Sequence, residues 1–282
     1  MSETVEKKKQ QFSTTRRLVE TAILLAAAFA LSFIKIIDLP YGGSVTACSM
    51  LPIVIVAYRY GTGWGLFTGF VYALLQIIQG VSAPAAGEIT SFVVMILLDY
   101  VLDFGVLGLG GIWKKTCRDN QALGMSLGML TVCILRYLCH VITGFTIWAD
   151  ASAPFAASLN FSLIYNATYM LPETIISVVS AFYIGNAFDF SGAQLRLVRS
   201  EKKKNTASIW MTVISWAFAL AALIWDVVLV FSNLQNPDTG AFMASGFANV
   251  NWTVFGIVTG AGVVLWAVFF FIGKAMNKKK DA

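Results

Sequence analysis

Charged and polar side chains recur at helical spacing inside long apolar segments of this sequence. Asp99 and Asp103 are four residues apart, and so are Arg136 and His140, the only histidine of the chain. Residues four apart lie on the same face of an α-helix. A charge in the apolar core of a membrane is costly unless it is paired or hydrated, so such residues usually mark a functional site.

A third apolar segment carries a similar polar face, formed by Tyr165, Asn166, Tyr169 and Glu173. Counting about 1.5 Å per residue from the outer end of each helix separates the polar residues of the three segments into two layers. The shallower layer, roughly 9–14 Å deep by the same count, contains Asp99, His140 and Asn166. The deeper layer, roughly 18–20 Å deep, contains Asp103, Arg136 and Glu173.

The two layers predict different roles. In the deeper layer, we expect Arg136 to pair with Asp103 or Glu173 as a structural ion-pair lock. The shallower layer combines a carboxylate, an imidazole and an amide, and Gly144 and Trp148 continue the helix face of His140 toward the outer rim. Aromatic residues surround this layer, which predicts a pocket for a small polar heterocycle, open to the outside.

The carboxylate of this pocket favours a cationic ligand. Asp99 lies next to Tyr100 in the sequence, and further aromatic residues follow on the other two segments. An aromatic face attracts a cation by roughly 0.5–2 kcal/mol. A flat cationic heterocycle, whose amino groups donate to Asp99, satisfies both features.

Composition identifies the elements that must position these residues. The chain is 57% hydrophobic and 12% charged, whereas soluble domains contain about 25% charged residues. Several apolar runs approach the roughly 20 residues that a spanning helix needs. We therefore predict an all-α polytopic membrane protein in a lipid bilayer, with spans at residues 18–37, 49–60, 63–80, 90–113, 122–148, 160–187, 208–232 and 250–273.

The distribution of Lys and Arg gives an orientation and a domain plan. Basic clusters precede the first span and follow the fourth, sixth and eighth spans. By the positive-inside rule both termini are cytoplasmic, so the net charge of +5 does not indicate nucleic-acid binding. The plan comprises a basic tail (1–17), a six-helix membrane domain (18–190), a basic linker (191–206) and an additional transmembrane hairpin with a basic end (207–282).

Small residues recur every fourth position on three of the predicted spans. These stripes are Ala22, Ala26 and Ala30, then Gly61, Gly65 and Gly69, and finally Gly256 and Gly260. Such stripes allow close backbone approach in lipid. Each stripe is open to two interpretations, internal packing or the docking of a partner protein.

Several classes of chemistry lack their motifs in this sequence. It contains no G-x-x-x-x-G-K-[ST] phosphate loop and no H-E-x-x-H zinc motif. The four cysteines have no C-x-x-C pair and are expected to be free thiols. No activated nucleophile is evident, so we predict neither an enzyme nor a metal or cofactor site, and ATP-driven uptake would require a partner chain.

Four stretches carry a family resemblance over about the first 190 residues. They are GGSVTACSMLPI (42–53), LLDYVLDFGVLGLGG (97–111), RYLCHVITGFTIW (136–148) and SLIYNATYMLPE (162–173). Together they resemble the thiamine-specific substrate-binding subunits, or S components, of energy-coupling factor transporters, the ThiT family. This resemblance implies a six-helix S-component bundle in a bacterial cell membrane, with an outward-facing thiamine pocket.

The resemblance also implies site residues and partners. The predicted substrate-binding residues are Asp99, Tyr100, His140, Gly144, Trp148, Phe161, Tyr165 and Asn166. The family docking face for a transmembrane coupling subunit maps onto Ala22, Ala26 and Ala30, and two ATPase subunits complete the complex. Some relatives have Glu, Tyr and Trp where this chain has Asp99, Phe161 and Gly43.

We predict a substrate-capture subunit that binds thiamine from outside, with the loop of residues 38–48 closing over it. ATP hydrolysis by the partner subunits then drives release to the inside. Two alternatives remain. One is an S component for another heterocyclic vitamin or precursor, and the other is an intramembrane enzyme or scaffold.

Overall fold

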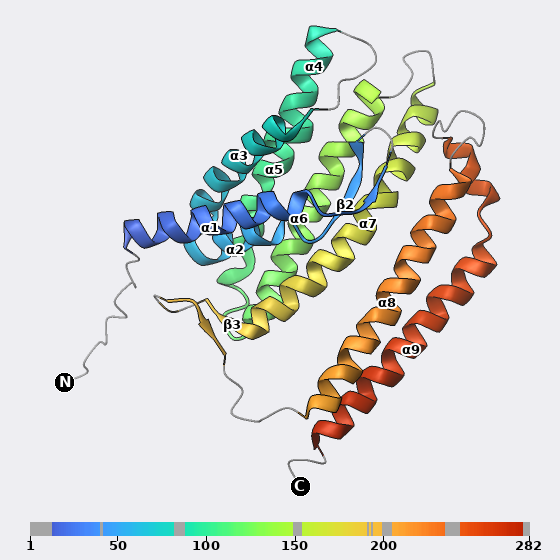
Figure 1. Ribbon diagram of the computed structural model, residues 1–282. Coiled ribbons are helices and arrows are strands. Elements are labelled where there is room, and N and C mark those ends of the chain that lie inside the picture. Colours follow the sequence, from blue (N-terminus) through green and yellow to red (C-terminus); the bar gives the residue numbers. More distant parts are fainter. Residues whose placement is uncertain are drawn as a thin grey trace. The chain divides into compact units, whose positions relative to one another are not determined.

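The computed structural model describes residues 13–39, 42–81, 88–148, 154–190, 192, 194–198, 205–234 and 243–278 (Figure 1). These residues belong to two compact units. The first comprises Met1–Asn166 with Glu173–Val198, and the second comprises Ala167–Pro172 with Arg199–Ala282. Most of the predicted basic tail, up to residue 12, and the basic part of the linker, residues 199–204, lie outside the described ranges.

Six helical segments lie between Thr14 and Ala187. They are α1 (Thr14–Ser32), α2 (Leu51–Tyr60), α3 (Thr62–Gln79), the composite helix Ile89–Lys114, the composite helix Gln121–Trp148, and α7 (Phe155–Ala187). The fourth contains α4 (Ile89–Met95), η2 (Ile96–Leu102), α5 (Asp103–Gly105) and η3 (Val106–Lys114), and the fifth contains α6 (Gln121–Thr143) and η4 (Gly144–Trp148). The stretches η2 and η4 are π-helical, a form that is frequent at functional sites.

Fewer helices of the described chain are long and apolar enough to span a membrane than the eight that the sequence predicted. Among the described residues, five helices are long and apolar enough to cross a membrane: Ile89–Lys114, Gln121–Trp148, Phe155–Ala187, Thr206–Asn233 and Trp252–Met276. The helix α2 is apolar but has only 10 residues. The fold is therefore all-α and multi-pass, but α1, α2 and α3 do not qualify as spans by length and composition alone.

The first predicted span, residues 18–37, is wrong at its C-terminal end. The helix α1 ends at Ser32, and the following residues form strand β1 (Lys35–Asp38), which pairs antiparallel with β2 (Ser44–Thr46). Ile36 and Ile37 continue the apolar run, but β-branched residues also suit a pleated strand. The result is a hairpin instead of a further turn of helix.

The β1–β2 hairpin contacts α7 through specific polar bonds. The backbone N–H of Gly43, in the hairpin turn, donates to the hydroxyl of Tyr165 at 3.1 Å. On β2, the hydroxyl of Thr46 donates to Oε1 of Glu173 at 2.7 Å. The first loop is therefore tied to the helix that carries part of the predicted site.

The core of the first unit lies around α2 and depends on close helix contacts. Ile53, Val54 and Val56 on α2 are fully buried. A Cβ added to Gly65 on α3 would lie 2.5 Å from the Cβ of Ala57, and one added to Gly69 would lie 2.5 Å from a backbone oxygen of α5. Gly65 and Gly69 thus serve internal packing, one of the two interpretations open from the sequence, whereas a Cβ at Gly61 would meet no atom of the described chain within 4 Å.

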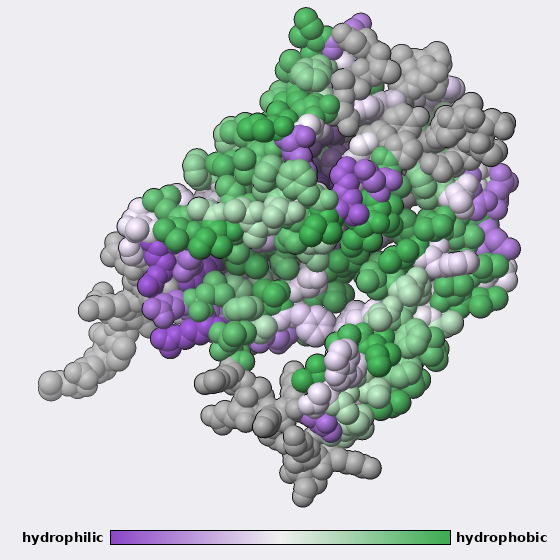
Figure 2. Space-filling model, viewed as in Figure 1, coloured by the Kyte–Doolittle hydropathy of each residue, from purple (hydrophilic) through white to green (hydrophobic). Residues whose placement is uncertain are grey.

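Much of the surface seen in Figure 2 is apolar, and the spanning helices expose large hydrophobic side chains. Leu97 and Leu102 on η2 are each 50% exposed, and Leu138 on α6 is 49% exposed. Large exposed hydrophobic side chains of this number need an apolar solvent, which a bilayer provides. The burial pattern therefore agrees with a multi-pass membrane protein.

A buried ion pair fixes α1 to α2. Nε of Arg59 lies 2.6 Å from Oε2 of Glu20 on α1, and the Arg59 side chain is fully buried. The same guanidinium donates to the backbone oxygen of Gly192 at 3.2 Å, just beyond strand β3 (Phe188–Asp189). Arg59 therefore holds together three segments that are distant in the sequence.

The second unit contains the predicted C-terminal hairpin. It consists of α8 (Thr206–Asn233), the short helix η5 (Ala244–Asn249) and α9 (Trp252–Lys278). The hydroxyl of Thr259 on α9 lies 2.7 Å from Oδ2 of Asp226 on α8, and the hydroxyl of Ser208 donates to the backbone oxygen of Gly273 at 2.6 Å. These bonds join the two helices directly.

Candidate binding site

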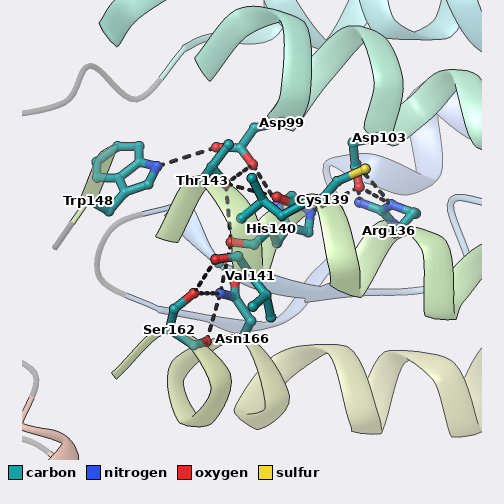
Figure 3. A network of polar contacts seen from close by, with 12 residues as sticks. Asp99, Asp103, Arg136, Cys139, His140, Val141, Thr143, Trp148, Ser162 and Asn166 are labelled. Atoms are coloured by element: carbon teal, nitrogen blue, oxygen red, sulfur yellow. Dashed lines mark hydrogen bonds and ion pairs between the residues drawn. The ribbon is translucent and has the colours of Figure 1, made fainter. Parts of the chain in front are cut away.

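His140 joins the two polar layers that the sequence predicted (Figure 3). Its Nδ1 lies 2.9 Å from Oδ1 of Asp99 on η2, and its Nε2 lies 3.2 Å from Oδ1 of Asp103 on α5. The imidazole is only 15% exposed. The shallow and deep residues therefore form one continuous polar cluster.

Asp99 accepts hydrogen bonds from three side chains of the composite helix Gln121–Trp148. Besides His140, the hydroxyl of Thr143 donates to Oδ1 at 2.5 Å, and Nε1 of Trp148 donates to Oδ2 at 3.3 Å (Figure 3). The π-helical turn at Gly144–Trp148 follows Thr143 directly. The structure thus brings together the predicted Asp99, His140 and Trp148 and adds Thr143, which the sequence analysis missed.

The deep layer contains the ion pair between Arg136 and Asp103. Nε of Arg136 donates to both carboxylate oxygens, at 3.0 and 2.9 Å, and a terminal nitrogen lies 2.8 Å from Oδ2. The Asp103 side chain is completely buried and that of Arg136 is 8% exposed. Of the two partners left open for Arg136, the structure selects Asp103, while Glu173 accepts from Thr46 of the hairpin.

Asn166 lies at the contact between α6 and α7. Its amide nitrogen donates to the backbone oxygen of His140 at 3.1 Å and to that of Ser162 at 2.8 Å. Asn166 is 3% exposed. In this structure the amide group therefore supports the backbone of His140 and does not contact the Asp99 carboxylate.

Gly144 allows the same two helices to approach closely. A Cβ at Gly144 would collide with the hydroxyl of Ser162 and lie 3.1 Å from the amide nitrogen of Asn166. The hydroxyl of Ser162 donates to the backbone oxygen of Val141 at 2.8 Å. The described contacts of Gly144 are thus helix contacts beneath the Asp99 cluster.

The remaining predicted aromatic residues lie in two other places. The rings of Phe161 and Tyr165 stack on α7 with centroids 6.0 Å apart, and the hydroxyl of Tyr165 accepts from Gly43 of the first loop. The hydroxyl of Tyr100 donates to the backbone oxygen of Gly80 at the end of α3, at 3.3 Å. Of the predicted aromatic set, Trp148 has a described hydrogen bond to the Asp99 carboxylate.

Other candidate features of the described chain do not overlap this cluster. A cavity of about 290 Å³ opens near the N-terminus of α6, where Asn120, Gln121 and Asn186 line it. The four cysteines are free thiols, as expected. Among the described residues there is no group of three or more His, Cys, Asp or Glu side chains arranged to hold a metal ion.

The predicted docking stripe lies on the outer face of α1. Ala22, Ala26 and Ala30 are all exposed, whereas Thr21 and Ala28 on the opposite face are buried. Internal packing within the described chain therefore does not account for this stripe. Its assignment to a partner subunit stays a prediction.

The fold and the cluster define a class of protein: a multi-pass helical membrane protein with a buried polar site formed where three helices meet. Residues 18–191 match the family model described as thiamine transporter protein (Thia_YuaJ), and the chain belongs to this family. The family resemblance of the four sequence stretches is thereby confirmed. Membership in this family places the chain among transport proteins and not among enzymes.

Two relatives found by sequence agree with the family assignment. The chain is 33% identical over 174 residues to the thiamine transporter ThiT of Bacillus subtilis (strain 168), covering 58% of this chain and 86% of the relative. It is 28% identical over 191 residues to the ThiT of Lacticaseibacillus paracasei, covering 60% and 87%. A solved structure of ThiT from Listeria monocytogenes is similar with a TM-score of 0.44 at 21% identity, covering 60% of this chain and 91% of that one.

Proposed function

We propose that the chain is the substrate-capture subunit of an ATP-driven vitamin importer and that it binds thiamine from the extracellular side. The observation that carries this proposal is the convergence of His140, Thr143 and Trp148 on the single carboxylate of Asp99. A polarised carboxylate beside an indole ring offers both an acceptor for an aminopyrimidine and an aromatic face for a cationic ring.

The charge of the cluster supports a cationic ligand. Its carboxylates are Asp99, Asp103 and Glu173, and its basic groups are Arg136 and His140. With His140 protonated and all three carboxylates ionised, the cluster carries three negative and two positive charges, which leaves one negative charge in a poorly hydrated environment. A ligand with one positive charge, such as thiamine, neutralises this excess, whereas an uncharged heterocycle does not.

The hairpin of the first loop gives the site a cover. Gly43 contacts Tyr165, whose ring stacks on Phe161. We infer that residues 38–48 close over the ligand, with these two rings as part of the pocket wall. Residues 40 and 41 lie outside the described ranges.

Transport requires partners in this proposal. The sequence lacks a phosphate-binding loop, so two ATPase subunits supply the energy and a transmembrane coupling subunit transmits it. The exposed stripe of Ala22, Ala26 and Ala30 on α1 supplies the docking face, because small residues allow close helix approach in lipid. Both termini lie in the cytoplasm, as the positive-inside pattern favours.

Thiamine binding is tested by tryptophan-fluorescence titration of the purified full-length chain in detergent. Thiamine should quench Trp148, and the quench should disappear in Trp148→Phe. Asp99→Asn should weaken binding by about 1–3 kcal/mol, the cost of a mispaired buried polar group. Pyridoxine serves as an uncharged competitor, and a preference for pyridoxine over thiamine would replace the proposal with another vitamin specificity.

Partner docking is tested by co-purification with the coupling and ATPase subunits. Ala26→Leu fills the exposed stripe and should abolish complex formation while thiamine binding by the isolated chain is unchanged. The control is Ile257→Leu, an apolar exchange at a residue of α9 that is 65% exposed and lies outside α1. Normal assembly of the Ala26→Leu variant would remove α1 from the interface.

A further inference from the structure

We propose that Asp103, clamped by Arg136, is a positioning residue that holds His140 as a doubly donating cation with Nδ1 directed at Asp99. The inference rests on the proposed function, because it concerns the same thiamine site. It assigns the deep ion pair a role in binding beyond the structural lock expected from the sequence.

The surroundings of the two ring nitrogens of His140 favour the doubly protonated imidazole. Each nitrogen lies within hydrogen-bond distance of a carboxylate oxygen, at 2.9 Å for Asp99 and 3.2 Å for Asp103. A neutral imidazole has one N–H and one lone pair, so one carboxylate would face the lone pair. Only the imidazolium donates at both nitrogens, and in a buried site each of these bonds is charge-assisted.

Asp103 is the fixed member of this arrangement. Its side chain is completely buried, and Arg136 holds both of its oxygens. A guanidinium fork constrains the plane of a carboxylate and thereby its position. Because Asp103 is fixed in this way, its bond to Nε2 fixes the imidazole ring as well.

Asp99 is the adaptable member. Its side chain is 11% exposed, and its second oxygen accepts from the partly exposed Trp148 at 3.3 Å. When a ligand binds to the Asp99 carboxylate, His140 retains its hydrogen bond to Asp103 and therefore its orientation and its charge. These four side chains thus form a chain of contacts that runs from Arg136 through Asp103 and His140 to Asp99. Its buried end is fixed, and the carboxylate at its other end is available to the ligand.

Other ionisable groups near His140 do not replace Asp103. Cys139 precedes His140 on α6 and offers only a thiol, which is a weak hydrogen-bond acceptor. On α7, Glu173 belongs to the same deep layer but accepts its hydrogen bond from Thr46. Glu173→Gln is therefore a matched control, because it removes a buried carboxylate from the cluster without removing an acceptor of His140.

The first measurement needs no ligand. His140 is the only histidine of the chain, so a protein with labelled histidine and a tag without histidines gives one assignable imidazole in nitrogen NMR. Histidines ordinarily titrate between about pH 5 and pH 8. Over this range we expect His140 of the full-length protein to remain protonated at both nitrogens, as in Glu173→Gln, whereas in Asp103→Asn it should titrate.

The second measurement tests whether the protonation of His140 affects the affinity for thiamine. In Asp103→Asn, the protonated imidazole is a positive charge without its compensating carboxylate beside a cationic ligand. Thiamine affinity of this variant should therefore be weaker at pH 6 than at pH 8, by a factor of about 3–10. This factor lies below the roughly hundredfold limit that one proton sets over two pH units, at tenfold per unit. The unsubstituted protein and Glu173→Gln should show no such slope, and Asp103→Glu should restore part of the flat profile.

The outcomes separate this inference from the proposed function. A His140 resonance that titrates normally in the unsubstituted protein overturns the inference, and this result does not depend on any variant folding. A titration of Asp103→Asn identical to that of the unsubstituted protein also overturns it. If the NMR behaviour is as expected but thiamine does not bind, the proposed function fails and the positioning of His140 remains.

Discussion

Thr143 shows how much a single hydroxyl contributes to the candidate site. It is 1% exposed and donates to Asp99 at 2.5 Å. Thr143→Val removes this donor with little change in shape and should weaken thiamine binding by about 1.5–3 kcal/mol, the typical value of one hydrogen bond to a charged group. Fluorescence titration measures the change, and Thr143→Ser, which keeps a hydroxyl, should bind almost normally.

Thr146 provides the matched control for that substitution. It lies three residues further along the same helix end, is exposed, and donates to the backbone oxygen of Ile142 at 2.6 Å. Thr146→Val should leave thiamine affinity unchanged. Equal losses for the two valine variants would mean that the Thr143 bond to Asp99 has no specific role.

Sequence spacing predicted best which residues share a helix face. His140 and Trp148 do lie on one face, because a helix places residues four apart on the same side, and both reach Asp99 of the neighbouring helix. Thr143 is outside this four-residue series, and the direction of Asn166 toward the backbone of His140 depends on the contact between two helices. Helical periodicity contains no information about that contact, so these features required the structure.

At the scale of elements, hydrophobicity predicted apolar segments more reliably than their conformation. The segment after Ser32 continues with Phe33 and Ile34, then Ile36 and Ile37, so the apolar run suggested a longer helix. An apolar run of this kind is compatible with helix or strand. What decides between them here is pairing with residues 44–46, which is a non-local interaction.

The buried Arg59 is an element-scale feature that its place in the sequence did not reveal. It pairs with Glu20 and contacts the backbone near β3, so it joins α1 to distant parts of the first unit. Removing one partner of a buried ion pair costs about 3–5 kcal/mol. Arg59→Gln should therefore lower the thermal unfolding temperature of the detergent-solubilised protein clearly.

An exposed ion pair of the same chain serves as the control. Lys35 and Asp38 lie 3.0 Å apart, but their side chains are 42% and 59% exposed. Asp38→Asn should cost no more than about 1 kcal/mol. If both substitutions lowered the unfolding temperature equally, burial would not be the source of the stability of the Arg59 contact.

The C-terminal hairpin has its own packing test in two glycines of α9. A Cβ at Gly262 would collide with the Cβ of Ala222 on α8, whereas one at Gly256 meets no atom of the described chain within 4 Å. Gly262→Leu should separate the two helices, and Gly256→Leu should not. Crosslinking of cysteines introduced at Ser208 and Gly273, whose side chain and backbone are hydrogen-bonded, measures the change; equal crosslinking in both variants would contradict the described packing.

At the scale of the whole molecule, the two units differ in their relation to the family. The family match ends at residue 191, and every described contact of the Asp99 cluster lies within the first unit. The helices α8 and α9 follow this match and contribute none of these contacts. The domain plan predicted from the basic linker therefore leads to a direct test of the second unit.

A chain that ends at residue 198 should bind thiamine with an affinity within about threefold of the full-length protein, a difference of less than about 1 kcal/mol. The reason is that Asp99, His140, Thr143 and Trp148 keep all their described mutual contacts in this shorter chain. Titration of both proteins in the same detergent measures the difference, with Asp99→Asn of the full-length chain as the reference for a damaged site. A truncated chain that remains monodisperse and helical but binds as weakly as this reference would assign the C-terminal hairpin a direct part in forming the site.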